Sequence, residues 1–281
     1  MVELPSHHSG NGDGDAVDLY GLVESHPAYQ AHNQKNRHRQ QKPVRRRFKS
    51  CPPDHAAISN RGMSGQMKDE AKDWTKEELM ERYVERWTPV TIPVNITIHG
   101  QQTILNLTKV EDILRQAETI AVRDCICRGK WHKCDAPVDV CLTLNHHARE
   151  AMKEGAKRIS LAQALVILKR THEAGLVHMA FMPKNEEKPE VICSCCNCCC
   201  GSLNAMLRFG IPDHVVASEY IAENNDKTCT SCGTCVERCQ FHARQLVDKK
   251  LVFNQAKCFG CGLCVSTCPT RSISLIKRNI H

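Results

Sequence analysis

The sequence has no long apolar run. Its most apolar stretch, ISLAQALVILK at 159–169, is about half as long as the ~20 residues that cross a bilayer. The N-terminal MVELPSHHSGNGDGD lacks the apolar core of a secretory signal. We therefore expect no transmembrane segment and no signal peptide. A cytoplasmic location follows as an expectation, and thiols stay reduced there.

Several signatures of complete redox enzymes are also missing. The sequence contains neither the dinucleotide fingerprint G-x-G-x-x-G nor a P-loop. It lacks the C-x₃-C-x₂-C motif of radical enzymes that use S-adenosylmethionine. These absences favour an electron carrier or an oxidoreductase subunit over a stand-alone enzyme.

Acidic residues are absent from 31–50, which carries eight Lys and Arg in a chain of net charge +7. The low hydrophobicity of 1–70 predicts a disordered basic leader. One alternative is a docking arm for an acidic redox partner, nucleic acid or an anionic membrane surface. Only Phe48 interleaves with these charges, so stacking on bases, and hence nucleic-acid binding, is not expected.

Cysteine is abundant, with 19 residues in a chain of 281. In VICSCCNCCCG, 191–201, six cysteines occupy eight positions. Adjacent cysteines rarely satisfy disulfide geometry, which needs Cα atoms roughly 4.4–6.8 Å apart. Thiolates gathered for a soft metal are the better explanation.

An internal repeat is the most informative feature of the chain. CTSCGTCVERC at 229–239 and CFGCGLCVSTC at 258–268 share the pattern C-x₂-C-x₂-C-x₃-C, 29 residues apart. Three closely spaced thiolates wrap one iron–sulfur cube, and the fourth reaches the other cube. That exchange predicts two quartets: Cys229, Cys232, Cys235 and Cys268; and Cys258, Cys261, Cys264 and Cys239. Two matched quartets argue against zinc.

Residues 220–279 resemble the bacterial-type two-cluster ferredoxin domain. The resemblance implies two [4Fe–4S] clusters held by the eight cysteines, in a pseudo-symmetric fold of two short hairpins and two short helices. The family places a proline after each fourth cysteine. Pro269 keeps it, but Gln240 replaces it in the first half, which loosens the turn or alters solvent access there without removing a ligand.

Ten further cysteines lie upstream of the repeat, in two loops that each follow a predicted strand. One or two further iron–sulfur clusters shared between the loops are the favoured interpretation, and a structural zinc site or a metal-free redox-labile tract stays open. This region is similar to that of uncharacterised ferredoxin-like proteins of anaerobes. The candidate ligands are Cys125, Cys127, Cys134, Cys141, Cys193, Cys195, Cys196, Cys198, Cys199 and Cys200.

The expected fold class is α+β, with three parts. They are the leader, 1–70; a small mixed α/β cysteine-rich domain, 71–219; and the ferredoxin-type domain, 220–281. Capping signals at Thr75 and Ser160 predict helix starts, and Gly175 predicts a helix end. We expect 125–141 to form a metal-binding loop.

The function predicted from these features is electron transfer. The chain would relay single electrons through at least two [4Fe–4S] clusters to a redox partner protein, a reductase or dehydrogenase. One alternative is an oxidoreductase subunit with a catalytic cluster at the 193–200 cysteines. Another is a redox-sensing regulator with a labile cluster.

Overall fold

The structure is a computed structural model that describes residues 73–93, 95–99, 102–106 and 108–278. The chain divides into two units, Met1–Pro43 and Val44–His281, and every described residue belongs to the second. The predicted basic leader therefore lies outside the described residues. In the part of the chain that is described, no helix is long and apolar enough to cross a membrane.

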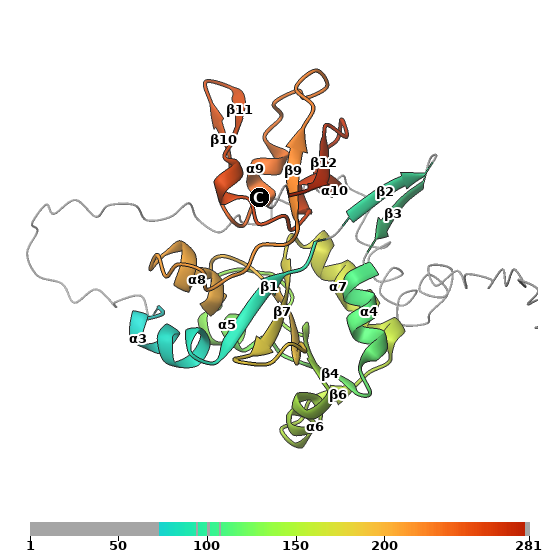
Figure 1. The fold of residues 1–281 in the computed structure, drawn as a ribbon, viewed down its shortest axis with the longest axis vertical. Coiled ribbons are helices and arrows are strands. Elements are labelled where there is room, and N and C mark those ends of the chain that lie inside the picture. The colour runs from blue at the N-terminus through green and yellow to red at the C-terminus, as the bar shows by residue number, and fades with distance from the viewer. Residues whose placement is uncertain (1–72, 94, 100–101, 107, 279–281) are drawn as a thin grey trace, which may run out of the picture. The chain divides into compact units, whose positions relative to one another are not determined.

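A six-stranded antiparallel sheet forms the centre of the upstream region (Figure 1). Each strand pairs antiparallel with its neighbours. In spatial order the strands are β1 (Trp87–Thr91), β7 (Val177–Pro183), β8 (Val191–Cys195), β5 (Cys141–Leu144), β4 (Ile120–Arg123) and β6 (Lys157–Arg158).

Helices α4 (Thr108–Gln116) and α7 (Leu161–Glu173) cover one face of this sheet. Leu114 and Leu168 from the two helices pack with Leu142 and Ile192 of the strands in one apolar core. Alternate residues of a strand point to opposite faces. The other face accordingly carries Cys193 and Cys195 of β8, together with the second core around Val177 and Phe181 of β7.

Local signals set three helix ends in the upstream region. Thr75 and Ser160 are helix caps, as predicted, and each forms a capping box, with Glu78 and Gln163 respectively. Helix α7 ends before Gly175, whose φ of 81° is left-handed, as predicted. The Thr75 box begins α3 (Lys76–Leu79), which continues as a π-helical turn, Met80–Val84.

The remaining helices and one strand pair complete this region. Strands β2 (Asn95–His99) and β3 (Gln102–Asn106) form an antiparallel pair. Helix α6 (Asn145–Lys153) follows β5, and α8 (Gly201–Leu207) follows the cysteine-dense stretch. The expectation of a loop throughout 125–141 is wrong in part, because α5 (Ile126–Trp131) begins directly after Cys125.

Two pairs of strands and two short helices build the C-terminal region. Strand β10 (Arg244–Val247) and β11 (Lys250–Phe253) form a hairpin. The second pair was expected to be a hairpin, but it is not. It consists of the first and last strands of this region, β9 (Tyr220–Asn224) and β12 (Ile273–Lys277), which pair antiparallel. The helices are α9 (Thr234–Arg238) and α10 (Leu263–Thr267), one in each repeat.

The C-terminal region packs on the cysteine-bearing face of the six-stranded sheet. Phe241 and Leu263 belong to the same buried core as Met179 and Leu203. Arg238 adds two hydrogen bonds to carbonyls at the end of α7. The predicted boundary between residues 219 and 220 stays a prediction.

Candidate metal centres

The two cysteine repeats fold in equivalent ways. In each repeat the first two cysteines lie in a loop, and a glycine of positive φ, Gly233 or Gly262, begins the short helix. The third cysteine lies in that helix, and the fourth lies directly after it. Thus the 29-residue sequence offset is matched by an equivalent backbone path.

The structure brings together the two quartets predicted from the spacing. One small cavity is lined by Cys229, Cys232, Cys235 and Cys268. Another is lined by Cys239, Cys258, Cys261 and Cys264. In each case the fourth cysteine comes from the other repeat. Ligation itself stays a prediction, but the geometry has the exchange that two cubanes require.

The fourth cysteines receive matching backbone hydrogen bonds. The Ala243 N–H donates to Cys239 Sγ at 3.3 Å, and the Ser272 N–H donates to Cys268 Sγ at 3.2 Å. Each donor lies four residues after its cysteine. Hydrogen bonds of this kind stabilise a thiolate and raise the reduction potential of a cluster that it binds.

The two quartets differ in their exposure to solvent. Burial raises the pKa of the Cys264 thiol to about 12 and also raises that of Cys261. Cys232 is exposed, and a hydrogen bond with Thr234 lowers the pKa of its thiol. The quartet containing Cys232 is therefore the one nearer to solvent.

A buried arginine lies between the two quartets. Arg244 is 3% exposed, and its Nη1 lies 3.9 Å from Cys235 Sγ of one quartet. Burial alone would lower the pKa of Arg244, but the nearby Cys264 thiol of the other quartet, with Cys235, raises that pKa. Its Nη2 is buried with no hydrogen-bond partner among the described residues. A buried guanidinium needs negative charge close by, so these thiol pockets fit anionic iron–sulfur clusters.

Six of the ten upstream cysteines gather around one cavity of about 310 Å³. Each thiol lies close enough to the next to perturb its pKa, in a continuous series. They come from the start of α5, the start of β5, strand β8 and the residue before α8. In the order of this series they are Cys125, Cys127, Cys200, Cys195, Cys193 and Cys141.

Polar groups at this six-thiol cavity support a charged centre. Hydrogen bonds with Cys127 and Cys195 lower the pKa of Cys200 to about 6. The Tyr83 hydroxyl lies 2.9 Å from Cys127 Sγ. Arg128, 1% exposed, lines the same cavity, and its Nη2 has no hydrogen-bond partner in the described part of the chain. These thiols and Arg128 fit an anionic metal centre, as at Arg244.

The other four upstream cysteines form a separate, tighter group. The Sγ atoms of Cys134, Cys196, Cys198 and Cys199 all lie within 4.8 Å of one another. Cys196 and Cys199 are buried, and the other two are partly buried. The two predicted loops therefore do meet, but their ten cysteines separate into six and four.

Three functional residues escape sequence reasoning. Arg128 and Arg244 carry no signal that separates them from surface arginines. Gln240 is recognisable as a departure from the family proline, but its role needs the fold. Its Oε1 accepts from the Asn197 N–H at 2.9 Å, and its Nε2 donates to the Gly175 carbonyl at 3.0 Å. Gln240 thus joins the C-terminal region to the cysteine-dense loop.

The family match to known proteins lies in the C-terminal region. No curated protein matches the chain. Residues 228–273 match the family described as the 4Fe-4S dicluster domain. The matched segment contains all eight cysteines of the two quartets. Together with the thiol geometry, the match supports iron–sulfur binding and electron transfer by a C-terminal 4Fe-4S dicluster domain.

Proposed function

We propose that the chain is an electron-transfer protein that relays single electrons through two [4Fe–4S] clusters to a redox partner protein. The proposal rests on the two C-terminal quartets, each of which takes its fourth cysteine from the other repeat, and on Arg244, which lies between them. When bound, each cluster supplies a one-electron redox couple. The chain sets the potential by burial and by hydrogen bonds to sulfur.

The unequal exposure of the quartets gives the relay an exposed outer end and a buried inner end. Exposed Cys232 supports docking of a reductase or dehydrogenase at the outer quartet. Cys239 and Cys261 of the inner quartet pack against the core that contains Cys195 and Cys200. Electrons would therefore pass between a partner docked at the exposed quartet and the six-thiol cavity beside the buried quartet.

The test is metal and sulfide analysis with EPR on the anaerobically purified full chain. We expect at least eight irons and eight acid-labile sulfides per chain. Cys232→Ser should perturb one EPR signal, and Cys261→Ser should perturb the other. The proposal fails if the protein is colourless and zinc fills the eight positions. It also fails if both variants change the same single cluster.

A second function is supported by the six-thiol cavity. A cubane needs four protein ligands, so six thiols leave two for other chemistry, and a cavity of about 310 Å³ is in the usual range for a small-molecule site. This arrangement favours a catalytic cluster in an oxidoreductase subunit. Twelve or more irons, with an EPR signal that shifts when a small thiol is added, would support it. Eight irons in the full chain would exclude it.

A further inference from the structure

We propose that Cys134, Cys196, Cys198 and Cys199 form a mononuclear zinc site, separate from every iron–sulfur cluster of the chain. The separation of the sulfurs carries this inference. Cys134 Sγ lies 3.7 Å from Cys196 Sγ, and Cys198 Sγ lies 3.7 Å from Cys199 Sγ. All four atoms fall within 4.8 Å of one another.

These distances fit one tetrahedral ion. Zinc–sulfur bonds of about 2.3 Å place the corners of a regular tetrahedron about 3.8 Å apart. A cubane inserts four irons and four sulfides between its ligands, so its thiolates lie farther apart. The two C-terminal quartets are less compact than this. Among the described residues, the group of Cys134, Cys196, Cys198 and Cys199 is the one in which three or more ligand atoms lie within 4.8 Å of one another.

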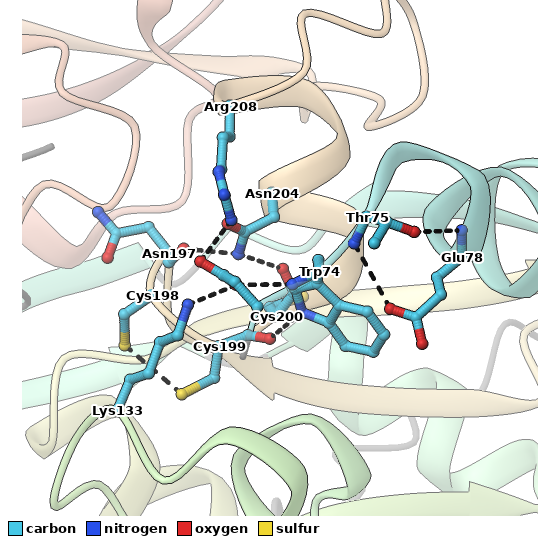
Figure 2. A network of polar contacts seen from close by, with 11 residues as sticks. Trp74, Thr75, Glu78, Lys133, Asn197, Cys198, Cys199, Cys200, Asn204 and Arg208 are labelled. Atoms are coloured by element: carbon cyan, nitrogen blue, oxygen red, sulfur yellow. Dashed lines mark hydrogen bonds and ion pairs between the residues drawn. The ribbon is translucent and has the colours of Figure 1, made fainter. Parts of the chain in front are cut away.

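Hydrogen bonds from neighbouring side chains help to position the loop that carries Cys196, Cys198 and Cys199. The Trp74 indole N–H donates to the Cys199 carbonyl at 2.8 Å (Figure 2). The Asn204 side chain donates to the carbonyls of Asn197 and Cys200. Arg128 Nη1 lies 3.7 Å from Cys196 Sγ and offsets part of the negative charge of four thiolates.

The donor set favours zinc over iron. Four thiolates leave no open position, which is typical of structural rather than catalytic zinc sites. For the same ligands, divalent zinc binds more tightly than divalent iron. The ion would connect Cys134, after α5, to the β8–α8 loop. Because Asn197 of that loop binds Gln240, zinc would also fix the surface on which the C-terminal region packs.

The test compares metal contents of the full chain. Wild-type protein should hold one zinc per chain in addition to its iron. Cys134→Ser should lose at least nine-tenths of the zinc while keeping its iron and sulfide. The matched control is Cys141→Ser, in the six-thiol group, which should keep the zinc. Protein loaded with Co²⁺ should show the visible absorption of tetrahedral cobalt thiolate, and Cys134→Ser should abolish it.

Absence of zinc from wild-type protein, or loss of iron and sulfide instead of zinc in Cys134→Ser, would overturn the inference. If Cys134→Ser is insoluble, zinc-edge X-ray absorption on the wild-type protein decides. Four sulfurs at about 2.3 Å support the site, and fewer than four exclude it. The outcome is independent of the proposed electron transfer, because that depends on the eight C-terminal cysteines alone.

Discussion

Replacing Arg244 by Gln should lower the reduction potentials of both clusters. The guanidinium is buried, lies 3.9 Å from Cys235 Sγ of one quartet, and is close enough to Cys264 of the other for that thiol to raise its pKa. Its positive charge would stabilise the electron that each proposed cluster gains on reduction. Gln removes the charge but keeps a polar side chain of similar reach, so the expected effect is electrostatic.

The contact distance bounds the size of the shift. Two unit charges 3.9 Å apart interact by about 4 kcal/mol at an effective dielectric constant of about 20. The added electron is spread over a whole cluster, whose centre is farther away, so we expect roughly 1–2 kcal/mol. For a one-electron couple, about 1.4 kcal/mol corresponds to about 59 mV. Each potential should therefore fall by roughly 40–90 mV.

The assay is an EPR-monitored redox titration of the full chain. Arg244→Lys is the matched control, since it keeps the charge but loses the planar fork of the guanidinium. We expect Lys to retain most of the wild-type potential. Two results would refute the reasoning: unchanged potentials in an Arg244→Gln protein with full iron content, or equal shifts in the Lys and Gln variants.

Two further predictions concern stability and one concerns iron content. Gln240→Pro restores the family residue but removes one hydrogen bond to the cysteine-dense loop and one to the end of α7. Urea unfolding should show that the free energy of unfolding falls by roughly 1–3 kcal/mol. The exposed control Pro269→Gln should change stability by less than about 0.5 kcal/mol, and equal effects would contradict a bridging role. Gly260→Ala should lower iron content by at least half of the dicluster iron, because its Cβ would lie 2.1 Å from the Tyr220 carbonyl oxygen and φ is positive; normal iron content would disprove this. Burial lowers the pKa of His214 to about 4, so the folded chain resists protonation below the ordinary value of about 6.5 and loses stability as pH falls. From pH 7 to 5, wild-type protein should lose about 2 kcal/mol more than His214→Leu in urea titrations, and parallel losses would argue against it.

Sequence reasoning succeeds where the signal is local. The helix after Ser160 is set by a capping box and a C-terminal glycine, and both act within one turn. The order of the six strands depends on packing between segments far apart in the chain, so no local signal predicts it. The sequence does not predict helix α5, because Gly129 in the middle of this six-residue helix lowers its helix propensity.

The membership of the two dicluster quartets could be predicted because it follows from a repeat. The ten upstream cysteines have no such period, and their division into six and four depends on the fold. Cys193 and Cys195 share one face of β8, since side chains alternate along a strand. The chain leaves the strand after Cys195, so Cys196 and the next two cysteines turn toward Cys134 instead.

This division has a chemical consequence for adjacent cysteines. Cys199 belongs to the closed four-thiol group, whereas Cys200, one residue on, precedes α8 and faces the six-thiol cavity. Loss of a redox-inert zinc ion would release the loop that carries Cys200. If the six-thiol cavity holds a cluster, Cys134→Ser should therefore alter its EPR signal without removing its iron, whereas Cys200→Ser should leave zinc in place. A change of zinc content in Cys200→Ser would show that the two groups act as one site.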